Sequence, residues 1–133
     1  MAIELTYLVW SIALFLIMIL AQSTAAIFSK KASMSDLVGA RDNLPKDGLT
    51  PFHGRTKRAQ YNMIEGMCMF APLVLVAAVT NSFSETTALG AALFFWGRVV
   101  FAPTYWLGVP WVRTLAWFVS IAGILMILWE LLT

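Results

Sequence analysis

The sequence is short of charged residues and has only one cysteine and one histidine. Charged residues make up 12% of the 133 positions, whereas hydrophobic residues make up 60%. A soluble domain needs a larger polar surface, so this composition excludes that class. Cys68 has no second cysteine to pair with, which excludes an internal disulfide. No cysteine or carboxylate stands at ligand spacing from His53, so we expect an exposed histidine and predict no metal site.

A strong charge of either sign is also absent. The net charge is +2, and the basic residues form no extended face with interleaved aromatic residues, so we expect no nucleic acid as a partner. What the sequence has instead is apolar runs long enough to span a bilayer, with a mean hydropathy of +0.79. We therefore predict a single all-α integral membrane domain over residues 1–133. It should be a bundle of four transmembrane helices at about 5–28, 56–79, 84–105 and 111–132.

The first apolar run has Glu4 and no basic residue in front of it. A signal peptide has a basic flank and a shorter apolar segment, so we interpret the run as a retained transmembrane helix. Gln22 is a polar interruption near the basic end of this run. Its amide either makes an interhelical hydrogen bond or lines a ligand site.

The longest polar connection covers residues 36–54 and contains five glycine or proline residues. This composition predicts an irregular loop, with a short interfacial helix at about 34–40. The connection between the second and third spans is very short, so these spans should form an antiparallel hairpin. Ser82 and Glu85 have the spacing of a capping box at the start of the third span.

Most basic residues belong to the first loop and its flanks. Lysine and arginine are enriched in cytoplasmic loops, so we expect the loop 36–54 in the cytoplasm and both termini on the other side. The chain would then be a multi-pass protein with the lipid bilayer as a partner, located in the inner membrane if its source is a bacterium. The basic residues concerned are Lys30, Lys31, Arg41, Lys46, Arg55, Lys57 and Arg58.

A polar stripe enters the second span. At about 100° per residue, Arg55, Arg58, Asn62 and Glu65 fall on one face of a helix. Such groups are costly inside a bilayer, so another helix or a bound anion should compensate for them. Counting residues from the helix ends places Glu65 at a depth similar to that of Arg98 on the third span. We therefore expect an ion pair between these two residues.

The remaining polar residues should form a shallower, cationic cluster. It consists of Arg58, Asn62, Tyr105 and Arg113, with Thr114 beside them. The directional hydrogen-bonding groups among them favour a pocket for a small polyanion with an apolar co-substrate. The alternative is binding of anionic lipid headgroups, which requires only exposed lysine and arginine.

Two motifs give the chain a resemblance to a known family. The first is R-x-x-R-A-x-x-N-x-x-E at Arg55, Arg58, Ala59, Asn62 and Glu65, followed by Pro72. The second is R-x-x-x-x-x-x-Y at Arg98 and Tyr105, followed by Gly108, Pro110 and Arg113-Thr114. With its length and span number, the chain resembles the membrane-associated proteins in eicosanoid and glutathione metabolism (MAPEG), in particular their bacterial members.

The resemblance implies a left-handed four-helix bundle that assembles as a homotrimer. It also implies glutathione as a co-substrate, bound between subunits near the cytoplasmic side and used against lipophilic electrophiles or hydroperoxides. Carried over by position, Arg58, Asn62 and Glu65 would contact glutathione from the second helix and Tyr105 from the third. The catalytic pair would be Arg113, which approaches the sulfur, and Thr114 beside it.

Three positions depart from the pattern of the family's enzymes. Phe101 stands where some members have histidine, Trp117 where tyrosine is common, and Thr114 where some have serine. The function therefore has two open alternatives: a glutathione-dependent transferase or peroxidase, or a non-catalytic member that binds lipid or a protein partner. A channel or transporter is disfavoured, because no span has an ionisable residue near its outer half. Arg113 is correspondingly either a catalytic residue or a positive anchor at the membrane surface.

Overall fold

The structure, a computed structural model, describes residues 1–133 and consists only of helices and their connections. Four helices are long and apolar enough to cross a membrane, which confirms the predicted all-α class and the number of spans. A fifth, short helix lies in the long connection, as predicted. The helices are α1 (Ile3–Phe28), α2 (Met34–Val38), α3 (Pro51–Val79), α4 (Glu85–Trp106) and α5 (Pro110–Leu132).

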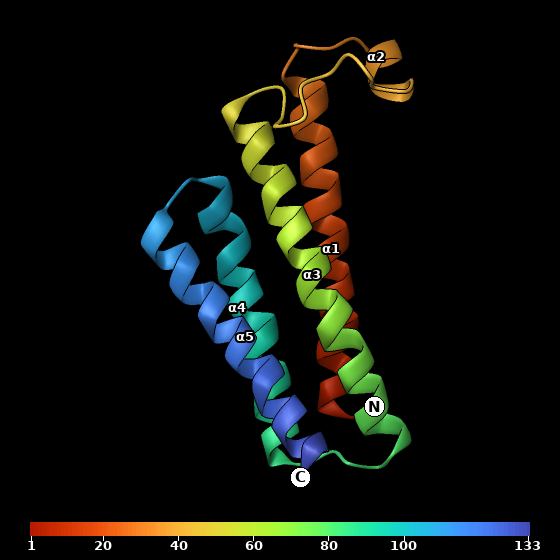
Figure 1. Cartoon of the computed structure of the whole chain (residues 1–133), viewed down its shortest axis with the longest axis vertical. Helices are drawn as coiled ribbons and strands as arrows, with labels where there is room; N and C mark the ends of the chain where they lie inside the picture. The colour runs from red at the N-terminus through yellow and green to blue at the C-terminus, as the bar shows by residue number, and fades with distance from the viewer.

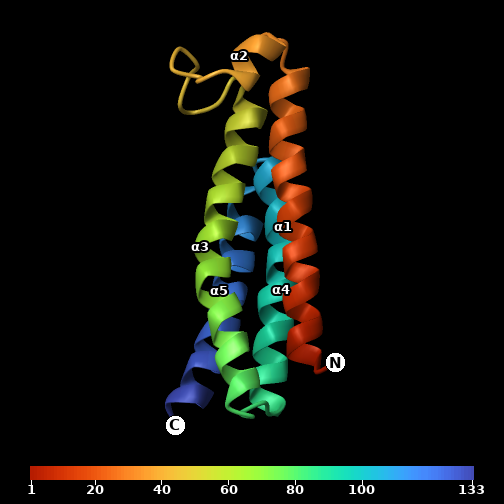
Figure 2. The ribbon, with the colours of Figure 1, turned by 90° about the vertical axis from the view of Figure 1, so that its right-hand side faces the viewer.

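The long helices run side by side along the long axis of the molecule (Figure 1). The most extensive contacts are those between α4 and α5, followed by those between α1 and α3. The predicted hairpin of α3 and α4 is present, with a short link over residues 80–84. Both termini lie at one end of the bundle, and α2 with its flanking loops lies at the other, as Figure 2 also shows. We refer to the latter as the loop end.

α3 begins five residues earlier than the predicted position 56. Thr50 is its N-cap and accepts a hydrogen bond from the His53 backbone N–H at 3.1 Å. Pro51 occupies the first helical position, where its missing N–H leaves no hydrogen bond unmade. Gly54 is needed there, because an added Cβ would lie 2.4 Å from the Asp47 carbonyl oxygen. Pro51 and Gly54, which the sequence analysis assigns to the irregular loop, therefore belong to the first turn of α3.

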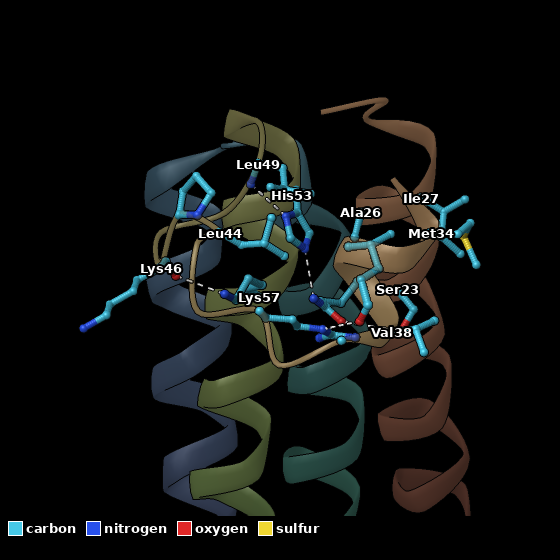
Figure 3. A pocket seen from close by; sticks show the side chains of 15 residues that line it. Ser23, Ala26, Ile27, Met34, Val38, Leu44, Lys46, Leu49, His53 and Lys57 are labelled. Carbon is cyan, nitrogen blue, oxygen red and sulfur yellow. Dashed lines mark hydrogen bonds between the residues drawn. The ribbon is translucent and has the colours of Figure 1, made fainter. Parts of the chain in front are cut away.

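His53 is buried, so the expectation of an exposed histidine was wrong. Its side chain is 5% exposed and lies between Leu49 and α1 (Figure 3). The Leu49 backbone N–H donates to Nδ1 at 2.9 Å, and the Gln22 amide lies 2.9 Å from Nε2. The atom that lies 2.9 Å from His53 Nε2 is the amide nitrogen of Gln22, so the two side chains share a hydrogen bond between α1 and α3. Gln22 thus makes the interhelical hydrogen bond that was one of its two predicted roles.

Side-chain caps fix the starts of α2 and α4. Ser84, rather than Ser82, caps α4, and its reciprocal partner is Thr87 rather than Glu85. At α2, Ser33 and Asp36 form the equivalent box. Hydrogen bonds from Ser33 lower the pKa of the exposed Asp36 carboxyl. A capping box is therefore present at the start of α4, as predicted, but the prediction of Ser82 and Glu85 as its two residues was wrong.

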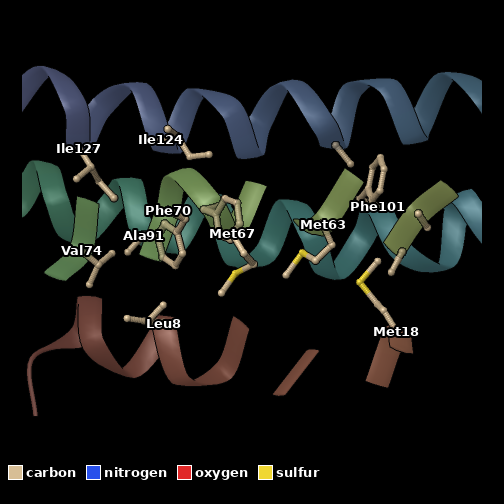
Figure 4. Packing of buried hydrophobic residues seen from close by; sticks show 14 residues of the cluster. Leu8, Met18, Met63, Met67, Phe70, Val74, Ala91, Phe101, Ile124 and Ile127 are labelled. Atoms are coloured by element: carbon tan, nitrogen blue, oxygen red, sulfur yellow. The ribbon is translucent and has the colours of Figure 1, made fainter. Parts of the chain in front are cut away.

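The core lies between the four long helices (Figure 4). Met63, Phe70 and Ile127 are fully buried, and the ring of Phe70 stacks on that of Phe94 with 4.1 Å between centroids. Lipid is as apolar as these side chains, so close packing rather than the hydrophobic effect holds the helices together.

Glycines bring α4 and α5 into backbone contact. A Cβ at Gly123 would lie 2.3 Å from the Gly90 carbonyl oxygen, and one at Gly90 would lie 2.7 Å from the Gly123 oxygen. Both oxygens belong to the backbone, so they cannot move aside as the end of a flexible side chain could. This close approach sets the position of α5, and with it the position of Arg113, against α4.

Candidate functional site

A cleft of about 210 Å³ opens between α3, α4 and α5. α3 contributes one of its lining residues, α4 two and α5 three. Four of the six are residues that the sequence nominated for binding or catalysis, and the other two are among the three positions that depart from the enzymes' pattern. The lining residues are Asn62, Phe101, Tyr105, Arg113, Thr114 and Trp117.

Arg113 is held in the first turn of α5 by an aromatic ring. Its guanidinium carbon lies 4.6 Å from the centroid of the Tyr105 ring, which in turn makes an edge contact with Phe101 at 5.3 Å. A cation over an aromatic face is attracted by the ring, and here the ring limits where the guanidinium can lie. Pro110 starts the helix, and the N–H groups of its first turn add positive potential at the same place. The cleft is therefore suited to an anion.

Thr114 uses its hydroxyl proton within its own helix. Thr114 Oγ1 donates to the Pro110 carbonyl oxygen at 2.9 Å. A threonine hydroxyl has one proton, so in this rotamer the oxygen offers only lone pairs to the cleft. Donation to a sulfur would require the hydroxyl to leave Pro110.

Asn62 connects the cleft to a buried arginine. The Arg98 side chain is 1% exposed, lies between the rings of Phe94 and Phe101, and donates through Nη1 to Asn62 Oδ1. Gly66 leaves room for it, because an added Cβ would lie 2.8 Å from Arg98 Nη2. With Oδ1 engaged, Asn62 retains its two amide protons for a ligand.

The expected Glu65–Arg98 ion pair is therefore not formed within the chain, because Asn62 takes the place of the carboxylate. Glu65 is exposed and so is Arg58, and neither lines the cleft. Arg55 donates through Nε to the Trp106 carbonyl oxygen at 2.8 Å and so ties the start of α3 to the end of α4. Of the four stripe residues, only Asn62 reaches the cleft.

A comparison with known protein families gives a match over nearly the whole chain. The sequence matches the MAPEG family over residues 7–133, which includes every residue of the cleft. The chain belongs to the MAPEG family. With its four candidate spans it is a multi-pass integral membrane protein. The family includes glutathione-dependent transferases and peroxidases. No curated protein and no solved structure compared with the chain matches it.

The partnership of Asn62 and Arg98 is the feature that sequence reasoning missed. Both residues were singled out, but each was given a different partner. A signal was present in the chain: Gly66 lies one turn after Asn62, and a glycine in the middle of an apolar helix often marks the close approach of a neighbouring group. In this MAPEG protein the neighbouring group is the guanidinium of Arg98.

Proposed function

We propose that the protein is a glutathione-dependent transferase or peroxidase that acts on lipophilic electrophiles or hydroperoxides at the cytoplasmic side of the membrane. The observation that carries the proposal is the convergence of Asn62, Tyr105, Arg113 and Thr114 from three helices on one cleft. Glutathione is the co-substrate, and the loop end of the bundle lies in the cytoplasm. Membership of MAPEG supports the reaction class.

We infer the role of each residue from its contacts. Asn62 offers amide protons to the peptide, and Tyr105 positions Arg113. Arg113 and the first turn of α5 stabilise the thiolate, which is the nucleophilic form of the thiol. In the transferase reaction the sulfur lone pair attacks the electrophilic carbon, a C–S bond forms, and the leaving group departs with the bonding electrons. The bilayer supplies the lipophilic substrate at high local concentration.

A second copy of the chain is needed to complete the site, and we propose a homotrimer. Glu65 lies at the midpoint of α3 and is exposed on the single chain. An acidic side chain at the centre of a spanning helix costs roughly 3 kcal/mol in lipid, so protein should cover it. The cleft of 210 Å³ is also smaller than the roughly 300–1,000 Å³ typical of ligand pockets. A neighbouring subunit against α3 would cover Glu65 and Arg58 and add the missing wall.

The assembly is tested by native mass measurement in a mild detergent, with chemical cross-linking as a second readout. We expect the mass of three chains under conditions that preserve the bundle. A protein that runs only as a monomer by both methods, while remaining folded by circular dichroism, would contradict the trimer.

The function is tested by adding glutathione to the detergent-purified protein and recording the ultraviolet absorbance of thiolate. We expect saturable thiolate absorbance at neutral pH, where free glutathione is largely protonated. S-methylglutathione is the matched control, because it has the same peptide and no ionisable thiol. It should compete for the site without producing the absorbance. Absence of thiolate absorbance at saturating glutathione would reject the enzyme.

One observation favours a second candidate, a non-catalytic lipid-binding member of the family. Phe101 and Trp117 line the cleft at positions where some members of the family have histidine and where tyrosine is common, so the cleft has fewer hydrogen-bonding groups for a tripeptide. If neither glutathione nor S-methylglutathione binds, but a fatty acid shifts the melting temperature, this candidate replaces the enzyme.

A further inference from the structure

A second, larger cavity lies at the loop end, away from the cleft. Its volume is about 540 Å³, within the range of small-molecule sites, and it shares no residue with the cleft. The end of α1, the short helix α2, the loop that follows α2 and the start of α3 enclose it, as Figure 3 shows. We refer to it as the loop cavity.

The lining of the loop cavity is basic and contains no acidic residue. Arg41 and Lys57 contribute cationic side chains, and the Lys46 side chain points away from the cavity (Figure 3). The loop carboxylates Asp36 and Asp42 line a neighbouring depression, which Arg41 also borders. Arg41 and Lys57 therefore have no counter-charge on the wall of the loop cavity itself.

Both cations are held in place by main-chain oxygens. Arg41 Nε donates to the Leu37 carbonyl oxygen, which leaves both terminal nitrogens of the guanidinium free to bind. The Arg41 backbone has a φ of 65°, a left-handed conformation that is uncommon for residues other than glycine and that often marks functional positions. Lys57 Nζ donates to the Lys46 carbonyl oxygen at 2.9 Å and keeps two further protons.

The remaining wall is divided between neutral polar groups and apolar groups. The Gln22 amide nitrogen is paired with His53 Nε2 at 2.9 Å, and its oxygen accepts from the Ser23 hydroxyl at 3.5 Å. Ala26 and Leu37 supply apolar surface beside it. α1 ends at Phe28, so the cavity lies where a spanning helix leaves the membrane.

We propose that the loop cavity binds a phosphate-type anion, supplied either by a phospholipid headgroup or by a soluble phosphate. A guanidinium fixed at Nε and an ammonium with free protons match phosphate oxygens in both charge and geometry. The apolar wall and the position at the membrane edge suit a headgroup with its acyl chains directed into the bilayer. The site does not depend on glutathione binding to the cleft.

The experiment uses the full-length protein in a non-ionic detergent and follows its melting temperature. Three probes are titrated: dihexanoyl phosphatidic acid, dihexanoylglycerol with the same acyl chains and no phosphate, and inorganic phosphate. We expect stabilisation by phosphatidic acid and none by dihexanoylglycerol. Stabilisation by phosphatidic acid alone identifies a headgroup, whereas equal affinity for inorganic phosphate identifies a soluble anion. The proposal is wrong if neither phosphate probe binds.

Three variants locate the site. Arg41→Gln and Lys57→Gln should each weaken phosphatidic acid about 10-fold, as expected for the loss of a charge-assisted hydrogen bond. Lys31→Gln is the matched control, because it removes an exposed positive charge from the same end of the bundle but not from the cavity. Unchanged affinity in both cavity variants would overturn the proposal.

A measurement on the unmodified protein removes any dependence on how the variants fold. Amine-directed labelling, read out by mass spectrometry, should be slowed at Lys57 by phosphatidic acid and unchanged at Lys31. Equal labelling of Lys57 with and without the lipid would also overturn the proposal.

Discussion

Replacing Asn62 by leucine is expected to lower the free energy of unfolding by about 3 kcal/mol. The substitution removes the acceptor of the Arg98 guanidinium, which is almost fully buried between two phenylalanine rings. Arg98 Nε already lacks a hydrogen-bond partner. The cation would then lie in a low-dielectric core without a hydrogen-bond acceptor, stabilised by the aromatic faces and by the more distant charge of Glu65. Few single changes in this chain should be more costly.

The opposite substitution, Arg98→Leu, should cost less. It leaves the neutral amide of Asn62 without its donor, but Asn62 is only half-buried and can bind water or a ligand at the cleft. The double variant Asn62→Leu/Arg98→Leu should recover part of the loss caused by Asn62→Leu, because no charge is then left unpaired.

Unfolding in a detergent mixture, followed by circular dichroism, measures these differences. Gln60→Leu is the matched control, an amide-to-leucine change on the same helix at a residue that makes no side-chain hydrogen bond to the rest of the chain. It should change stability by less than about 0.5 kcal/mol. If Asn62→Leu is as stable as this control, the hydrogen bond does not hold Arg98.

The error over the partner of Arg98 shows what residue counting along helices can establish. Counting gives depth reliably, at about 1.5 Å per residue, and it placed Glu65 and Arg98 at similar levels. It does not give the rotation of each helix about its axis. Asn62 and Glu65 are three residues apart and so point about 60° away from each other. That rotation, set by the packing of α3 against its neighbours, directs Asn62 toward Arg98 and Glu65 outward.

The fold itself was largely predictable, because each span is an apolar run longer than a bilayer requires. The errors occur at the starts of helices, where one or two side chains determine which residue is the first in the helix. Thr50 and Pro51 extend α3 back into the expected loop and carry His53 into a buried position. Proline and glycine density alone cannot distinguish a loop from the first turn of a helix, because proline is favoured at both.

Four of the six nominated site residues lie together because the motifs place them at compatible levels on α3, α4 and α5. Arg58 and Glu65 are the exceptions, and they lie on an exposed face of α3. Hydrophobic periodicity within one chain cannot show what a second chain covers. The role of these two residues therefore depends on the proposed trimer rather than on the fold of the subunit.

Replacing Arg113 by leucine is expected to abolish the thiolate absorbance of bound glutathione. We also expect kcat to fall about 100-fold, because enzymes that lose one preorganised group stabilising the developing charge slow by about this factor. A free thiol with a pKa of about 8.5 is only a few per cent ionised at neutral pH. Each unit by which the site lowers that pKa corresponds to about 1.36 kcal/mol of preference for the thiolate. Arg113 can provide this preference because a guanidinium does not lose its proton in proteins.

Arg113→Lys is the informative comparison. Lysine retains the charge but has no planar guanidinium to lie over the Tyr105 ring, 4.6 Å away in the native protein. Its ammonium should be less precisely placed, so we expect the thiolate absorbance to be reduced rather than lost. Both variants should still assemble and bind S-methylglutathione with similar affinity, since the thioether has no charge to stabilise. Full thiolate absorbance in Arg113→Leu would mean that the first turn of α5 suffices to ionise the thiol, and Arg113 would then be only a positive anchor at the membrane surface.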